Sequence, residues 1–257
     1  MERFVAGSSP LHHLDARIKV IITLVLIVSF VLTPAEAWPA YPLLWAVIGS
    51  LAAAGQLGVG RVALRGAVAL PFMLAALPLI FTTPGQPLLT VFGSTASEEG
   101  LARVIAILLK SWLSVQAALI LTMTTPFSDL LWALTSLRVP RTLVIIMGFM
   151  YRYLFILSDE AHRLLRARSS RSAVLPGSKA GGGLIWRGLV AGSMIGNLFV
   201  RSYERSDRVY TAMLARGYQG QMRISNPPPL TRRSLVWGAL PIVAVILIQL
   251  MVLWWSR

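Results

Sequence analysis

Residues 159–172 read DEAHRLLRARSSRS, and residues 204–217 read ERSDRVYTAMLARG. The two segments carry one pattern twice: an acidic residue leads, an arginine follows four residues later, and a second arginine comes eight residues after that, between small residues. An alanine also coincides in the two copies, at Ala167 and Ala212. Two similar arginine-tipped helices in one polar region predict two equivalent docking points. Most of the remaining chain is apolar and is expected to support these two helices.

The composition is that of a membrane protein. Of the 257 residues, 56% are hydrophobic and 13% are charged, whereas soluble proteins average about 25% charged residues. The net charge of +14 does not indicate nucleic-acid binding, because long uncharged apolar stretches separate the basic clusters. A basic surface facing the cytoplasmic side of a membrane, in contact with lipid, explains the charge more simply. The chain has no cysteine, which excludes disulfides and thiolate metal sites.

Five apolar stretches are near the length of about 20 residues that a bilayer requires. Asp15 is predicted to cap the first of them. In the third, Pro71 and Pro78 are expected to kink the helix. The predicted spans are residues 16–33, 38–57, 62–83, 101–124 and 235–255.

The segment between the fourth and fifth spans differs from the rest of the chain. Residues 125–233 hold 16 of the 24 lysines and arginines but only five of the ten acidic residues. We predict amphipathic helices here: a stretch over 139–157, a first arginine-tipped helix over 159–172, and a stretch over 184–200 that leads into a second one over 201–217. The predicted regions are therefore 1–124 with four spans, 125–233 with the cytoplasmic helices, and 234–257 with the last span.

Loop charge predicts the topology, because cytoplasmic loops are rich in lysine and arginine. The basic loops alternate with loops that lack Lys and Arg, which places the N-terminus in the cytoplasm and the C-terminus outside a multi-pass protein of the cell (inner) membrane. In an alternative with seven spans, 139–157 and 184–200 would also cross the membrane. That alternative would put five basic residues of 163–179 outside, so we favour helices that lie at the inner membrane surface.

Arg171 and Arg216 are the strongest candidates for a functional site. An arginine offers a planar fork of donors that binds carboxylates through two hydrogen bonds, and the small neighbours would let it enter a narrow acidic groove. Gly217 also marks a helix end. The alternative is an ordinary basic surface that binds lipid head groups. The flanking small residues are Ser170, Ser172, Ala215 and Gly217.

Other motifs carry weaker predictions. The chain has none of the P-loop, H-E-x-x-H or G-x-S-x-G patterns, so no enzyme active site is predicted. His12-His13 lacks further ligands at useful spacing, and no metal site is expected. Lys110 lies inside a predicted span. A charged residue there either has a functional role or pairs with other groups within the bundle. A face of small residues predicts close helix packing, within this chain or against a partner; it consists of Gly188, Gly192 and Gly196.

Five polar motifs, spread over nearly the whole chain, resemble those of one transporter family. They read LDARIK at 14–19, LRVPR at 137–141, FMYRY at 149–153, DEA at 159–161, and ERSDRVY at 204–210 continuing to ARGY at 215–218. The chain resembles the transmembrane (T) component of energy-coupling-factor (ECF) transporters, in the cobalt/nickel-type, CbiQ-like branch. The resemblance implies an all-α membrane protein with about five transmembrane helices plus long cytoplasmic amphipathic coupling helices.

The resemblance also implies partners. Each coupling helix of the family ends in a small-Arg-small motif that docks into a groove on one of two ATP-binding subunits, and a separate membrane S component binds the substrate. ATP and Mg²⁺ belong to the ATPase subunits, so no cofactor and no catalysis are expected in this chain. The motif at 215–217 matches outright. In the first copy, 170–172 fits the repeat spacing, whereas Ala167-Arg168-Ser169 fits the letters better; the repeat favours Arg171, and Arg168 remains the alternative.

A second function class is a stand-alone permease or an integral membrane enzyme. A permease of this kind typically shows inverted repeats of its spans, with broken helices at a midplane site. The spans here show no such pairing, and Lys110 alone supplies charge deep within one. Uptake by the purified chain alone would favour this class over the scaffold.

Overall fold

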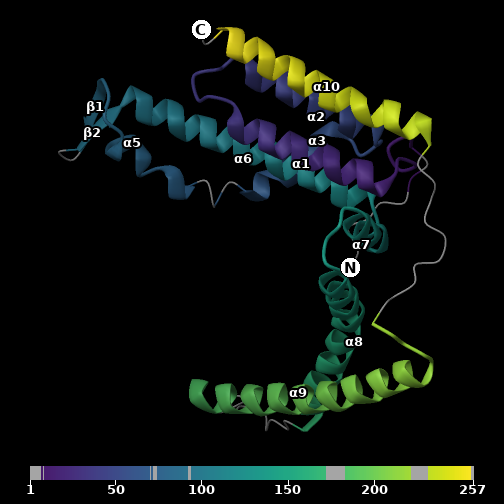
Figure 1. The fold of residues 1–257 in the computed structure, drawn as a ribbon. Helices are drawn as coiled ribbons and strands as arrows, with labels where there is room; N and C mark the ends of the chain where they lie inside the picture. The colour runs from purple at the N-terminus through teal and green to yellow at the C-terminus, as the bar shows by residue number, and fades with distance from the viewer. Residues whose placement is uncertain are drawn as a thin grey trace. The chain divides into compact units, whose positions relative to one another are not determined.

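The fold is described from a computed structural model for residues 7, 9–69, 71, 74–91, 94–171, 183–220 and 231–255. The chain divides into two compact units. The first unit comprises Met1–Leu137 and Asn226–Arg257, and the second comprises Arg138–Ser225. Helices make up most of the described structure, as expected of an all-α membrane protein (Figure 1).

The first unit is a bundle around α1, and the second unit consists of α8 and α9. In the bundle, α1 packs against α6, α7 and α10, and α10 also packs against α2. The elements of the first unit are α1 (Ala16–Leu32), α2 (Ala40–Ala54), α3 (Val59–Gly66), η1 (Ala67–Ala69), η2 (Leu74–Ala76), α5 (Leu79–Thr82), β1 (Pro87–Val91), β2 (Ser94–Ser97), α6 (Glu98–Thr124), α7 (Phe127–Ser136) and α10 (Arg232–Trp255). Those of the second are α8 (Arg141–Arg171) and α9 (Leu184–Ala215).

Apolar side chains from α1, α2, α6 and α10 form the bundle core. Its most enclosed members, each at most 2% exposed, are Leu26, Phe30, Leu44, Ile48, Leu113 and Val245. One polar bridge crosses this core: the side-chain amide of Gln249 on α10 donates to the carbonyl oxygen of Ser29 at 2.9 Å and contacts the hydroxyls of Ser29 and Thr33 at 2.7 and 2.9 Å. Such interhelical hydrogen bonds hold apolar helices together where water is absent.

The third predicted span is not a continuous helix in the described residues. Residues 62–83 do not form one kinked helix; the described part breaks into α3, η1, η2 and α5. Two prolines only seven residues apart, Pro71 and Pro78, each remove a backbone donor and clash with the preceding turn. Each proline therefore disfavours a continuous helix through this segment.

The loop predicted over 84–100 is also more ordered than expected. β1 and β2 pair antiparallel as a hairpin, and α6 begins at Glu98, three residues before the predicted start. The Ser97 hydroxyl accepts a hydrogen bond from the Gly100 amide at 3.0 Å and donates to the Thr83 carbonyl at 2.7 Å. Ser97 is thus the N-cap of α6, and Glu98 and Glu99 lie in its first turn, where negative charge is favourable.

The region predicted as a separate apolar stretch and a separate arginine-tipped helix is one helix, α8, of 31 residues. No glycine or proline occurs from Phe149 to Ser172, so nothing in the sequence ends the helix near Leu157. In the described part of the chain, three helices are long and apolar enough to cross a membrane, namely α6, α8 and the 234–254 part of α10. α1 and α2, with 17 and 15 residues, are shorter.

α8, which contains most of residues 139–157 of the seven-span alternative, is long and apolar enough to cross a membrane. α9, which contains the returning span of that alternative, is not among the three helices. The number of spans and the side on which each terminus lies remain predictions.

Candidate functional site

The C-terminal end of α9 is closed by a Schellman motif built on the Ala-Arg-Gly sequence. Arg216 is the C-cap residue, and Gly217 follows with φ +80°. The Gly217 amide donates to the Leu214 carbonyl at 2.9 Å, and the Tyr218 amide donates to the Met213 carbonyl at 3.0 Å. These are the two hydrogen bonds that define the motif. The predicted helix end at Gly217 is confirmed.

This geometry leaves the Arg216 side chain available. Arg216 and its neighbours Ala215 and Gly217 are all exposed, and within the described residues Arg216 forms no ion pair. The partial negative charge at the end of a helix favours a cation at this position. The tip of α9 therefore presents an exposed arginine between small residues, on a backbone that the cap holds in place.

Gly217→Val is expected to loosen this tip. A β-carbon at Gly217 would meet nothing within 4 Å, so the cost comes from the positive φ alone, about 1–2 kcal/mol for a residue with a β-carbon. Hydrogen exchange at the Tyr218 amide should accelerate, because that amide closes the motif. Gly217→Asn is the matched control, since asparagine tolerates this conformation. Equal protection of the Tyr218 amide in both variants would contradict the expectation.

The tip of α8 differs from that of α9. Arg171 is the last residue of the helix and is exposed, and the Ser170 hydroxyl donates to the Arg166 carbonyl at 3.0 Å. Ser172, the third member of the predicted motif, lies outside the described residues.

Arg168, the alternative docking residue of the first copy, is engaged within the second unit. It is half-buried, and its guanidinium lies 5.8 Å from the centroid of the Trp186 ring on α9. This distance is within the range of a cation–π interaction. The two candidate arginines of α8 therefore differ in their surroundings. Arg168 lies within cation–π distance of Trp186 on α9, and Arg171 is exposed at the helix end.

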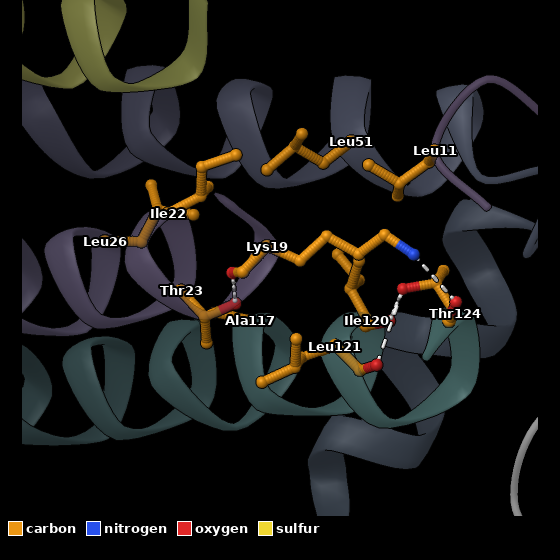
Figure 2. Close-up of a pocket in the computed structure, with 10 residues that line it drawn as sticks. All are labelled: Leu11, Lys19, Ile22, Thr23, Leu26, Leu51, Ala117, Ile120, Leu121 and Thr124. Carbon is orange, nitrogen blue, oxygen red and sulfur yellow. Dashed lines mark hydrogen bonds between the residues drawn. The ribbon is translucent and has the colours of Figure 1, made fainter. Parts of the chain in front are cut away.

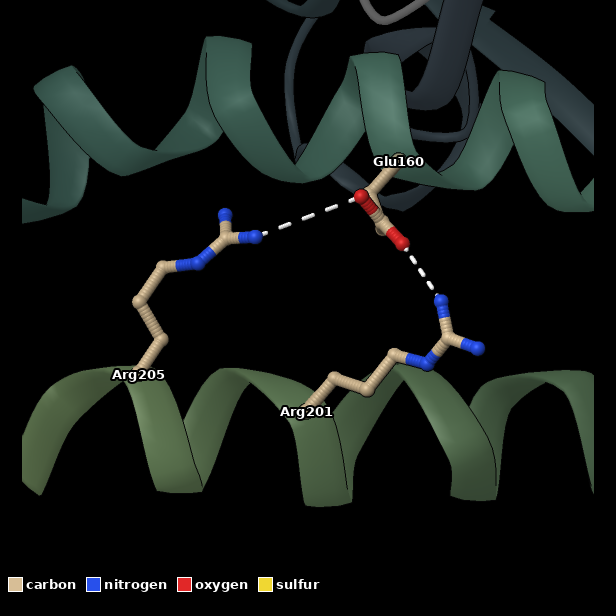
Figure 3. A network of polar contacts seen from close by, with 3 residues as sticks. All are labelled: Glu160, Arg201 and Arg205. Atoms are coloured by element: carbon tan, nitrogen blue, oxygen red, sulfur yellow. Dashed lines mark hydrogen bonds and ion pairs between the residues drawn. The ribbon is translucent and has the colours of Figure 1, made fainter.

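Glu160 joins the two helices at a second point (Figure 3). Its carboxylate, on α8, accepts a hydrogen bond from Arg201 of α9 at 2.7 Å and lies 4.0 Å from the guanidinium of Arg205. The Glu160 side chain is only 16% exposed. One carboxylate therefore holds two arginines that are one helical turn apart.

A groove of 520 Å³ lies between α8 and α9. Met213 and Tyr218, the two residues joined by the outer hydrogen bond of the Schellman motif, line it together with Arg205 of the Glu160 network. Residues from the tip of α9 and from the ion-pair network between the helices therefore line the same groove. Its α8 side is formed by Ile146, Phe149, Met150, Tyr153 and Leu157.

The predicted packing face of small residues is open in the part of the chain that the structure describes. A β-carbon at Gly188, Gly192 or Gly196 would meet nothing within 4 Å. Close packing of this face, within the chain or against a partner, remains a prediction. The close approach occurs instead at Gly238 on α10, where a β-carbon would clash with the γ-methyl of Ile18 on α1. Gly238 is an isolated glycine, so no repeat marked it in the sequence.

Gly238→Ala is expected to destabilise the bundle. The added methyl group would push α10 away from α1, and overpacking of this kind costs about 1–3 kcal/mol. The midpoint of thermal unfolding of the detergent-solubilised protein should fall. Gly192→Ala, the control, should leave it unchanged or raise it, because alanine favours a helix over glycine by about 1 kcal/mol. A lower unfolding midpoint for Gly192→Ala than for Gly238→Ala would contradict the close packing of Gly238 against Ile18.

The LDARIK motif at the start of α1 acts through packing and capping. Asp15 is the N-cap, and its carboxylate accepts a hydrogen bond from the Arg17 amide at 2.9 Å, which confirms the predicted cap. The Arg17 guanidinium lies 3.9 Å from the centroid of the Trp132 ring on α7. Lys19 is 6% exposed and donates hydrogen bonds to two backbone carbonyls. Leu14 and Ile18 enter the bundle core.

The sequence is similar to known proteins over most of its length. Residues 7–226 match the family model CbiQ, described as cobalt transport protein, which covers well over half of the chain. The chain belongs to the CbiQ family. It is 30% identical to the cobalt transport protein CbiQ of Rhodobacter capsulatus over 178 residues, which cover 68% of this chain and 70% of that protein.

Relatives of this CbiQ-family chain also include energy-coupling-factor transporter transmembrane proteins, EcfT. The protein from Lactococcus lactis is 25% identical over 271 residues, with 100% of this chain and 97% of the relative covered. That from Thermanaerovibrio acidaminovorans is 28% identical, with 95% and 91% covered. The chain is thus a membrane component of the ECF and cobalt transport proteins, as its motifs predicted.

In this CbiQ-family chain, Lys110 has a structural contact. Its ammonium group donates to the Val31 carbonyl at 3.3 Å, in the last turn of α1, where the carbonyls have no partner within the helix. This contact agrees with the alternative in which Lys110 pairs with another helix. His12, part of the weak metal motif, contacts the Ser9 hydroxyl through Nδ1 at 2.6 Å. Among the described residues, no three His, Asp or Glu side chains gather as metal ligands.

Proposed function

We propose that this chain is the coupling subunit of an ATP-driven ECF-type uptake transporter. In this role it links two cytoplasmic ATP-binding subunits to a membrane subunit that binds the substrate, and the cargo is cobalt or nickel ions. Membership in the CbiQ family supports the cobalt assignment, and the similarity to EcfT proteins supports the ECF arrangement. ATP and Mg²⁺ would be held by the ATP-binding subunits.

The observation that carries the proposal is the preformed tip of α9. Arg216 stands exposed at a Schellman-capped helix end between small residues, which suits insertion into a narrow acidic groove. Because the cap already holds the backbone of this helix end in place, its docking would cost less conformational entropy than the docking of a mobile segment. The tip of α8, with Arg171 exposed at its end, would serve the second ATP-binding subunit.

The surroundings of the two α8 arginines support Arg171 over Arg168 as the docking residue. Arg168 would have to leave the Trp186 ring before it could bind a partner. Among the described residues Arg171 has no ion pair to give up. In the proposed arrangement Arg168 holds α8 to α9, and Arg171 enters the ATPase groove.

The test is co-expression of the tagged chain with the ATP-binding and membrane subunits encoded beside it, followed by affinity purification in detergent. We expect both kinds of partner to copurify. Vesicles that contain the complex should take up radioactive cobalt or nickel only when ATP is supplied. Uptake by the purified chain alone would overturn the scaffold role and support a stand-alone permease. Faster uptake of one of the two ions would identify it as the transported substrate.

A further inference from the structure

Lys19 connects three segments of the first unit. Its ammonium group donates to the carbonyl of Thr124, the last residue of α6, at 3.0 Å. It also donates to the carbonyl of His12, in the segment before α1, at 3.2 Å. Figure 2 shows the Lys19 side chain extending from α1 toward Thr124. Carbonyls at a helix end lack partners within the helix, so Lys19 caps α6.

The surroundings of Lys19 exclude a substrate-binding role. The cavity beside it measures 20 Å³ and is lined mostly by apolar side chains, among them Ile22, Leu26 and Ile120. A space of that size holds one water molecule. Lys19 is therefore enclosed by protein, and its role follows from its two hydrogen bonds to backbone carbonyls.

The residues around Lys19 hold the helix that follows α6. Arg17 lies over the Trp132 ring of α7. Ala16 and Val20 form a small buried cluster with Trp132 and Ala133. The first turn of α1 thus fixes both the end of α6 and α7. The chain continues from α7 directly into the second unit, which begins at Arg138, a residue with φ +66°.

We propose that Lys19 is a positioning residue for energy coupling, an inference that rests on the proposed function. The ATP-binding subunits would move α8 and α9, and that movement reaches the bundle through the α6–α7 junction. The hydrogen bonds of Lys19 hold this junction against α1. Without them the α6–α7 junction would move relative to α1, and ATP would be hydrolysed without transport. Lys19 touches neither ATP nor the cargo in this role.

The test compares Lys19→Met with Lys110→Met in the purified complex. Both variants keep the length of the side chain and remove one ammonium group that caps a helix end, and both act on the α1–α6 pair. Only Lys19 lies at the α6–α7 junction. We expect K19M to retain its ATP-binding subunits and ATP hydrolysis, while the ATP consumed per ion transported rises about tenfold, since hydrogen bonds from a charged donor are among the stronger ones. K110M should keep the wild-type ratio.

The ratio of ATP consumed to ions transported distinguishes a positioning role from a loss of folded protein. A purely structural defect would lower ATP hydrolysis and transport together. An unchanged ratio in K19M, or the same rise in K110M, would overturn the proposal. If K19M does not assemble, Arg17→Met decides: it removes the cation from the Trp132 ring, and a normal ratio in it overturns the proposal. A wild-type chain that recovers no ATP-binding subunit would instead refute the proposed function itself.

Discussion

Replacing Arg171 and Arg216 together with alanine is expected to abolish recovery of the ATP-binding subunits and ATP-dependent uptake. Each guanidinium is exposed at the end of its helix. A central arginine at an interface is worth about 2 kcal/mol or more, which corresponds to about 30-fold in affinity. Each single variant should therefore weaken the complex, and the double variant should lose it. The measurement is the amount of ATP-binding subunit that copurifies with the tagged chain, together with uptake in vesicles.

The control replaces two exposed arginines on the same helices but away from the tips, Arg166 and Arg208. It removes the same charge and should retain most of the binding. A third variant, Arg168→Ala, separates the two candidate positions on α8, since loss of binding there with normal binding in Arg171→Ala would move the docking point to Arg168. Full transport by the R171A/R216A variant would refute the docking role of both tips.

Glu160→Arg is expected to separate α8 from α9. The substitution would replace the shared carboxylate by a third guanidinium opposite Arg201 and Arg205, so an attraction becomes a repulsion. Neutralising Glu160 would cost about 1 kcal/mol, because Arg201 is 58% exposed and solvent screens the pair. Reversal of the charge costs more and should also widen the 520 Å³ groove, so we expect a large loss of transport.

Spin labels can measure this separation directly, because the chain has no native cysteine. Labels on cysteines introduced at the exposed positions His162 of α8 and Tyr203 of α9 should report a broader distance distribution in E160R. Combining E160R with Arg201→Glu and Arg205→Glu restores opposite charges and should narrow it again. Glu204→Arg, which affects only an exposed pair with Arg208, is the control. An unchanged distribution in E160R would show that apolar contacts alone hold the helices.

Several features followed from sequence patterns because their causes are local. The N-cap at Asp15 and the helix end at Gly217 depend on the conformation of a few adjacent residues. The all-α class and membrane location follow from long apolar stretches, in which the backbone must satisfy its own hydrogen bonds. The break in the segment 62–83 also has a local cause, since Pro71 and Pro78 each interrupt a helix.

Other features depend on which helices meet. Gly188, Gly192 and Gly196 form the more conspicuous pattern, yet the described chain leaves them open and uses Gly238 against Ile18. Similarly, Arg168 and Arg171 are alike in sequence, and the ring of Trp186 distinguishes them. No spacing along the chain encodes either contact, because each joins residues from separate helices.

The sequence by itself determined the helical membrane character, the paired arginine tips and the family, since these reside in composition, periodicity and short motifs. The tertiary structure decided what the polar residues between helices do. Lys19 and Lys110 are two lysines in apolar surroundings, and only the packing of α1 against α6 brings each to a carbonyl at the end of the other helix. An unpartnered carbonyl becomes a binding partner for a cation only when another helix places that cation within reach.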